Sequence, residues 1–227
     1  MKAFILAAGR GERMRPLTDH TPKPLLMAGG KALIVWHLER LAAAGFKEII
    51  INHAHLGEQI EAALGDGSTW GLRIQYSPEP PGALETAGGI ANALPLLGDA
   101  PFLLVNGDVY CDVDFGLFSA YTVALAPPQA HLLMVNNPAH HSGGDFSLDG
   151  EQVVYAHDDQ TYTYAGIAVF SPSFFADVKR GEIMKLRPLL DAAIRLGTLT
   201  GERFAGRWVD VGTPQRLAEL DAELRNA

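Results

Sequence analysis

The segment that follows the first apolar stretch of the chain combines residue types that hold phosphate groups. Gly9 and Gly11 come directly after residues 2–7, and glycines allow main-chain N–H groups to turn toward an anion. Arg13 adds positive charge, and Lys23 adds more between two prolines that limit where its amine can reach. The spacing predicts a loop that binds a polyphosphate.

A second candidate group stands at the end of another apolar run. Asp108 follows residues 102–106, and a short acidic side chain behind a parallel strand can reach the ligand crevice of an open α/β sheet. It is our first candidate for a metal ligand. The alternative is a simple turn, because Asn106-Gly107-Asp108 also consists of common turn residues.

The loop differs from two better-known phosphate loops. It lacks the Gly-Lys-Ser/Thr of a Walker loop, and Met14 replaces the third glycine of a dinucleotide fingerprint. The segment instead resembles the signature of the nucleotide-sugar pyrophosphorylases, which join a nucleoside triphosphate to a sugar 1-phosphate. The matching residues are Ala7, Ala8, Gly9, Gly11, Arg13, Pro16, Leu17, Thr18, Pro22, Lys23, Pro24 and Leu25.

The resemblance implies a reaction that needs positioning and charge more than a general base. The sugar phosphate is ionised and is its own nucleophile, so basic groups and a metal offset the repulsion between two anions. It makes Lys23, Arg13 and Asp108 catalytic, with Arg13 on the β- and γ-phosphates. The nucleotide-binding set is Ala7, Ala8, Gly9, Gly11, Glu12, Arg13, Lys23 and Gly88.

The family pattern Trp-x-Asp-x-Gly-Thr occurs at residues 208–213 and adds a second carboxylate, Asp210. The resemblance implies that Asp108 and Asp210 bind Mg²⁺, an ion that prefers hard oxygen ligands. Asp210 could instead cap the next helix, although Thr213 fits that role better. The pairs His53/His55 and His140/His141 lack a third zinc ligand and are interpreted as pocket-lining or surface residues.

Further segments are expected to form the sugar side of the site. Residues 84–90 resemble the family segment near the base and sugar, with helix packing as the alternative explanation of its two glycines. The predicted sugar-phosphate-binding residues are Glu85, Asn106, Asp145 and Gly166.

Four stretches, residues 51–54, 84–86, 94–102 and 137–146, resemble the branch of the family that uses UTP and N-acetylmuramic acid 1-phosphate in peptidoglycan recycling. The sugar's lactyl carboxylate would need a partner, for which Arg203, Arg207 and Lys185 are candidates. The alternatives are glucose or mannose 1-phosphate with UTP, dTTP or GTP, and a non-catalytic nucleotide-sugar sensor.

Composition limits the class of protein. The 227 residues are 48% hydrophobic and 19% charged, enough for a substantial core, and the formal net charge of -8 argues against nucleic acid and anionic membranes as partners. Cys111 is the sole cysteine, and no signal-like or membrane-spanning segment is recognised, so we expect a cytoplasmic protein. Without C-terminal hexapeptide repeats, a monomer or small homo-oligomer is expected.

The elements that must position these residues alternate in the first half of the chain. Strands are predicted at 2–7, 48–52, 73–76 and 102–106, and helices at 32–45, 58–64 and 86–94. The second half suggests a helix at 115–124, strands at 131–136, 153–157 and 162–170, a hairpin turn at 148–150, and helices at 188–196 and 214–225. The prediction is one Rossmann-like α/β domain over residues 1–227, with a mostly parallel mixed sheet and a small antiparallel sugar-binding portion.

Overall fold

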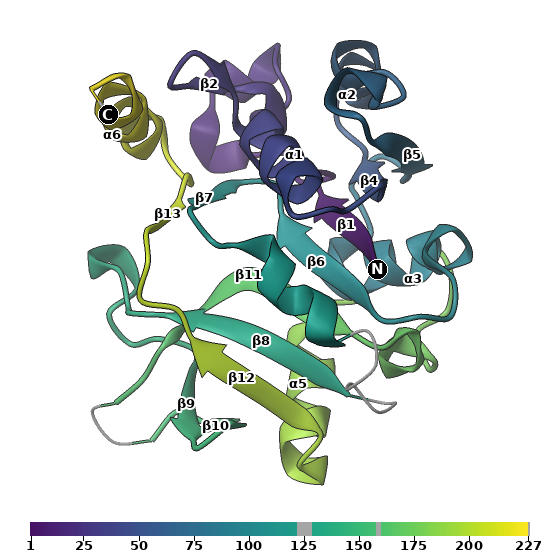
Figure 1. The fold of residues 1–227 in the computed structure, drawn as a ribbon, viewed down its shortest axis with the longest axis vertical. Coiled ribbons are helices and arrows are strands. Elements are labelled where there is room, and N and C mark those ends of the chain that lie inside the picture. The colour runs from purple at the N-terminus through teal and green to yellow at the C-terminus, as the bar shows by residue number, and fades with distance from the viewer. Residues whose placement is uncertain (122–128, 158–159, 227) are drawn as a thin grey trace.

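The fold is built around a large twisted sheet. A computed structural model describes residues 1–121, 129–157 and 160–226, and within these ranges nine strands form one sheet in the order β5-β4-β1-β6-β11-β8-β12-β10-β9 (Figure 1). Every strand runs in one direction except β11 and β10. The predicted mostly parallel, mixed α/β sheet is confirmed.

The first half of the chain supplies the parallel part. The strands are β1 (Lys2–Leu6), β4 (Glu48–His53), β5 (Arg73–Pro78) and β6 (Phe102–Asn106), connected through α1 (Leu33–Ala43), α2 (Gly57–Leu64) and α3 (Glu85–Leu97). β1 lies between β4 and β6 and pairs with both in parallel. A central strand covered on both faces must be apolar throughout, which explains the sequence of residues 2–7.

The second half closes the sheet with antiparallel pairs. It contributes β8 (Ala130–Val135), β9 (Phe146–Asp149), β10 (Gln152–Tyr155), β11 (Thr163–Phe170), α5 (Arg187–Leu196) and β12 (Leu199–Arg203). β11 inserts between β6 and β8, and β9 and β10 form the predicted hairpin. The strand at 199–203, which the sequence analysis missed, is half exposed and carries Gly201 in its middle.

Side chains alternate between two apolar layers. Ile5 faces a core with Ile34 and Leu38 of α1, whereas the adjacent Phe4 faces a core with Ile90 of α3 and Leu190 of α5. This alternation is the two-residue period of a strand. Helices therefore cover both faces of the sheet, and the polar ends of the strands meet at one edge.

A small antiparallel ribbon joins the C-terminal segment to that edge. Its strands are β7 (Val109–Cys111) and β13 (Trp208–Asp210), and α6 (Pro214–Arg225) follows and packs beside a short hairpin of β2 (Met27–Ala28) and β3 (Lys31–Ala32). Thr213 caps α6 by accepting a hydrogen bond from the Arg216 amide. Met14, Val211 and Leu220 share one buried cluster, so α6 packs against the loop that follows β1.

Two predicted helices differ from the structure. Residues Phe115–Ala120 form a 3-10 helix, whose three-residue turn places Phe115 and Phe118 together in the core, and residues 122–124 of that prediction lie outside the described residues. α3 continues through Pro95 to Leu97, because Pro95 sits in the last turn of the helix. In the described part of the chain, no helix has the length and apolar character needed to cross a membrane.

Candidate active site

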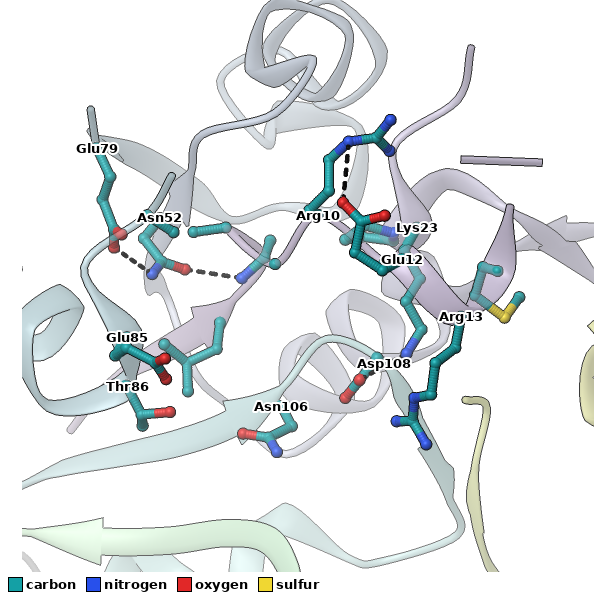
Figure 2. A pocket seen from close by; sticks show the side chains of 18 of the residues that line it. Arg10, Glu12, Arg13, Lys23, Asn52, Glu79, Glu85, Thr86, Asn106 and Asp108 are labelled. Carbon is teal, nitrogen blue, oxygen red and sulfur yellow. Dashed lines mark hydrogen bonds and ion pairs between the residues drawn. The ribbon is translucent and has the colours of Figure 1, made fainter. Parts of the chain in front are cut away.

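A cavity of about 450 Å³ opens at the carboxyl ends of β1, β4 and β6. It is lined by most of the predicted nucleotide-binding residues, and Figure 2 shows lining side chains that come from separate elements, among them Lys23, Asn52 and Asp108. The lining contains Ala7, Ala8, Gly9, Gly11, Glu12, Arg13, Lys23, Asn52, Glu79, Glu85, Thr86, Asn106 and Asp108. The sequence prediction of a ligand crevice behind β1 is thus matched by a cavity in the structure.

The start of the loop is fixed by a buried polar chain. The Ala7 amide donates to Oδ1 of Asn52 at 2.7 Å, and Nδ2 of Asn52 donates to Oε1 of Glu79 at 2.6 Å (Figure 2). The Leu84 amide donates to the other Glu79 oxygen at 2.8 Å. Burial raises the pKa of the Glu79 carboxyl, although the hydrogen bonds from Asn52 and Leu84 oppose that rise. The network links the glycine loop after β1 to the segment that precedes α3.

The middle of the loop turns at Gly11. Its φ of +69° is left-handed, and an added Cβ would lie 3.0 Å from a methyl carbon of Thr18, so the position requires glycine. The Thr18 hydroxyl donates to the Gly11 carbonyl at 2.9 Å. Arg10 forms an ion pair with Asp19 at 3.0 Å, and this contact, with Arg15 beside it, lowers the pKa of Asp19. Arg10 is therefore held at the rim of the loop.

Lys23 reaches the cavity from beneath the loop. A 3-10 turn, Lys23–Leu25, begins directly after Pro22, and the lysine is only 7% exposed. Its Nζ lies 2.7 Å from Oδ2 of Asp108. Among the described residues, this nearly buried ammonium pairs with one carboxylate, that of Asp108, and both residues line the cavity. The positive charge of Lys23 therefore lies at the cavity wall.

A second cavity, of about 300 Å³, adjoins the first. The two share Arg13, Asn106 and Asp108, and the second is otherwise lined by Val109, Pro138, His140, His141, Thr163, Tyr164, Ala165, Gly166, Trp208 and Asp210. Two ligands bound side by side would therefore meet at a cation, an amide and a carboxylate.

Asp210 lines the second cavity on the ribbon beside Asp108. The Val211 amide donates to the Asp108 carbonyl at 3.0 Å, and Asp210 is paired in register with Val109. Oδ2 of Asp210 lies 2.6 Å from Nη1 of Arg216 and 3.3 Å from Nε2 of His140. No cluster of three His, Cys, Asp or Glu side chains suited to a metal occurs among the described residues. Asp210 ends β13, and Asp108 directly precedes β7, the strand that pairs with β13. Carboxylate oxygens are the ligand type that Mg²⁺ prefers.

Gly166 sits where the pairing of β11 with β8 becomes irregular. Its φ is +71°, and an added Cβ would lie 2.9 Å from the Cβ of Asn106. The backbone of β11 therefore approaches the end of β6 closely, and the glycine leaves room for the Asn106 side chain at the boundary of the two cavities.

Two predicted site residues lie outside both linings. Gly88 packs against residues 182–184, and its amide donates to the Met184 carbonyl at 3.1 Å. The adjacent Gly89 faces the polar chain instead, since an added Cβ would lie 2.5 Å from Oε1 of Glu79. Asp145 contacts the second cavity indirectly: Oδ2 accepts from the Tyr164 amide at 2.8 Å, and Oδ1 lies 3.1 Å from Nε2 of His141.

The basic residues considered for a sugar carboxylate also lie outside the two linings. Arg203 donates to Asn136 at 3.0 Å, and Arg207 pairs with Glu223. Lys185 is exposed. The two histidine pairs separate: His53 contacts Glu61 at 2.7 Å and His55 contacts the Thr18 carbonyl at 2.9 Å, whereas His140 and His141 line the second cavity.

Sequence reasoning missed the residues that support the site from beneath. Asn52 is the next-to-last residue of β4, and Glu79 directly follows β5. Their place at the carboxyl ends of parallel strands could have identified both. Arg216 had no such signal, because it stands on α6 and reaches Asp210 only through the folding of the C-terminal segment.

Comparison with known proteins agrees with this geometry. Residues 2–227 match the sequence profile of the Nucleotidyl transferase family. The chain is 54% identical over 227 residues to the N-acetylmuramate alpha-1-phosphate uridylyltransferase of Neisseria meningitidis serogroup B, covering 98% of this chain and 97% of the relative. The enzyme of the same name from Caulobacter vibrioides is 35% identical, with 99% and 96% covered.

A solved structure shares the fold at low sequence identity. It is described as a putative glucose-1-phosphate thymidylyltransferase from Bacillus anthracis, and it aligns with a TM-score of 0.86 and 21% identity over 100% of this chain and 96% of its own. The profile match over nearly the whole sequence, together with relatives this similar, establishes that the chain belongs to the nucleotidyl transferase family.

Proposed function

We propose that this protein transfers the uridylyl group of UTP to N-acetylmuramic acid 1-phosphate and releases pyrophosphate. The observation that carries the proposal is the meeting of two cavities at Arg13, Asn106 and Asp108. One cavity would hold the nucleoside triphosphate against the glycine loop, and the other would hold the sugar. The similarity to two uridylyltransferases of this name supports the choice of base and sugar.

In the proposed reaction, an oxygen of the sugar phosphate attacks the α-phosphorus of UTP, and the bond to the β-phosphate oxygen breaks. Lys23 would lie between the two reacting phosphates, because its ammonium is directed toward Asp108 at the cavity boundary. Arg13 would hold the departing pyrophosphate. Groups fixed before substrate arrives stabilise charge as it shifts without reorganising, which is where the catalysis would come from.

Asp108 and Asp210 would hold Mg²⁺ in this scheme. When bound, the ion neutralises phosphate charge and aligns the phosphate oxygens. In the structure both carboxylates pair with cationic side chains, Lys23 and Arg216. These pairs offset the repulsion between the two carboxylates.

We place the reaction in the cytoplasm, where UTP is available, and in the recycling of cell-wall sugars, which would supply the muramic acid substrate. Residues 1–227 would act as one nucleotidyltransferase domain, as a monomer or small homo-oligomer.

The test is pyrophosphate release with Mg²⁺. Each of UTP, dTTP, GTP, CTP and ATP is paired with the 1-phosphates of N-acetylmuramic acid, N-acetylglucosamine, glucose and mannose. Turnover confined to UTP with the muramic acid substrate supports the proposal. Turnover confined to another pair overturns the substrate assignment and keeps the reaction, whereas silence throughout favours a sensor.

A further inference from the structure

N-acetylmuramic acid 1-phosphate carries one charge that N-acetylglucosamine 1-phosphate lacks, the carboxylate of its lactyl group. A site that prefers the first sugar must provide a partner for that carboxylate, because an unpaired charge in a cavity is costly. Among the described residues that line the second cavity, the side chains able to carry positive charge are Arg13, His140 and His141. Arg13 also lines the first cavity, on the side of the phosphates.

His140 is already engaged. Its Nε2 lies 2.7 Å from Nη1 of Arg216 and 3.3 Å from Oδ2 of Asp210, and its Nδ1 faces the same Arg216 nitrogen at 3.4 Å. Both ring nitrogens of His140 therefore face the Arg216 guanidinium that pairs with Asp210. Neither nitrogen is free to bind a ligand.

His141 is engaged on one side only. Its Nε2 lies 3.1 Å from Oδ1 of Asp145, and no described residue forms a hydrogen bond with its Nδ1. The side chain is 42% exposed. With Asp145 accepting from Nε2, a protonated ring donates its second N–H, from Nδ1, to a further anion.

The turn that carries His141 is anchored to β11. Asp145 accepts from the Tyr164 amide at 2.8 Å through its second oxygen, and Asn137 bonds to Thr161 at 2.8 Å and to Thr163 at 2.9 Å. The short helix Ala139–His141 is thus fixed against the strand that forms the floor of the cavity. A fixed donor discriminates between ligands better than a mobile surface lysine does.

We propose that His141, oriented by Asp145, binds the lactyl carboxylate and makes the enzyme select N-acetylmuramic acid 1-phosphate over N-acetylglucosamine 1-phosphate. The inference rests on the proposed function, because it concerns the acceptor of that reaction. The charged groups around the ring are Asp145 behind it and Arg13, Asp108, His140 and Asp210 in the same cavity. The lactyl carboxylate would bind to Nδ1 of His141 without breaking the hydrogen bonds and ion pairs of these groups.

The experiment compares wild type with His141→Ala, His141→Asn and Asp145→Asn, using kcat/KM for both sugar phosphates with UTP. Turnover of the muramic acid substrate by wild type tests the proposed function separately. For His141→Ala we expect the ratio of the two kcat/KM values to fall about 10- to 100-fold, mainly through KM. His141→Asn keeps a donor near the Nδ1 position, so the ratio should partly recover, and Asp145→Asn should lower it less than His141→Ala.

His140→Ala is the matched neighbour. It disturbs Arg216 and Asp210, so both sugar phosphates should lose activity and the ratio should stay within about threefold of wild type. If His141→Ala leaves the ratio unchanged, the inference is overturned. Equal losses for both sugars would then assign His141 a structural role. If one sugar turns over too slowly, dissociation constants for the two sugar phosphates by calorimetry give the same ratio, and the melting temperature reports whether each variant is folded.

Discussion

Lys23 and Asp108 are 85 positions apart in the chain and form a 2.7 Å ion pair at the boundary of two cavities. The lysine is nearly buried, whereas the side chain of Asp108 is 39% exposed. The pair joins the loop after β1 to the end of β6. In the proposed reaction it would hold the Lys23 ammonium where the phosphates of both substrates converge.

Replacing Lys23 with alanine should lower kcat about 10³-fold, because a fixed charge at the reacting phosphates is lost. Lys31→Ala is the control, since Lys31 pairs with Glu39 and stacks on Trp36 outside both cavities. Steady-state pyrophosphate release measures both variants. A Lys23→Ala enzyme with near-normal kcat would remove the lysine from the mechanism.

Asp108→Asn and Asp210→Asn should each abolish most turnover and raise the Mg²⁺ concentration needed for half-maximal rate. Neither change opens a core cavity, so melting temperatures should stay within a few degrees of wild type. A Mg²⁺ titration of the rate, with the exposed Asp149→Asn as control, makes the comparison. Unchanged Mg²⁺ dependence in both variants would show that the ion binds elsewhere.

Asn52→Ala should weaken UTP binding without changing the sugar site. The variant leaves the Ala7 amide and the buried Glu79 carboxyl without their partner, which costs about 1–3 kcal/mol for each unsatisfied group. We expect KM for UTP to rise about tenfold or more, and KM for the sugar phosphate to change little. Chemical denaturation measures the stability loss, and Asn92→Ala, whose side chain bonds to Ser77, is the comparison on the neighbouring surface.

His37 gives the protein a specific acid sensitivity. Burial lowers the pKa of His37 to about 4, and its Nε2 donates to the Val109 carbonyl at 2.7 Å. A histidine with a depressed folded pKa contributes stability above its ordinary pKa of 6.5 and loses it as the pH falls toward 4. The contribution lost is about 3 kcal/mol of unfolding free energy.

The variant His37→Gln, which retains an N–H donor, should remove that part of the pH dependence. Urea unfolding of wild type and variant at pH 7 and pH 4 gives the difference. Parallel stability profiles for the two proteins would contradict the assignment to His37.

Gly166→Ala should raise KM for the sugar phosphate and destabilise the fold by about 1–3 kcal/mol. The added Cβ both strains a left-handed backbone and crowds Asn106. Gly150→Ala is the matched control, because Gly150 has a φ of +58° and no atom within 4 Å of an added Cβ. Strain alone would affect stability equally in both variants, so a rise in KM confined to Gly166→Ala reports the displacement of Asn106.

The first half of the fold could be predicted because the hydrophobic pattern of each segment there matches its place in the sheet. Residues 2–7 are apolar since β1 is covered on both faces, and the glycines that follow mark the same strand's end. The short strands β7 and β13 could not be predicted in this way. Each has three residues, and they pair only because the chain returns to the sheet edge about a hundred positions later.

For the candidate site, the signature predicted the loop and Lys23, the place after an apolar strand predicted Asp108, and a second family pattern predicted Asp210. The supporting contacts depended on three-dimensional packing. Gly88 and Gly89 are adjacent and identical in sequence, yet only Gly89 faces the polar chain, because one step along a helix turns a residue by about 100°. Arg216 lies in the first turn of α6, which Thr213 caps, and from there it pairs with Asp210. No sequence motif predicts this contact.

The two cavities are lined by different stretches of the chain. Apart from the residues that they share and Gly212, the first is lined only by residues from positions 6–86, and the second by Val109 and residues from positions 138–210. With the donor in the first cavity and the acceptor in the second, as proposed, substitutions in the later stretch would alter acceptor preference and leave the donor side unchanged. An enzyme organised in this way can acquire new products through changes in the residues that line one cavity, without changes in those that line the other.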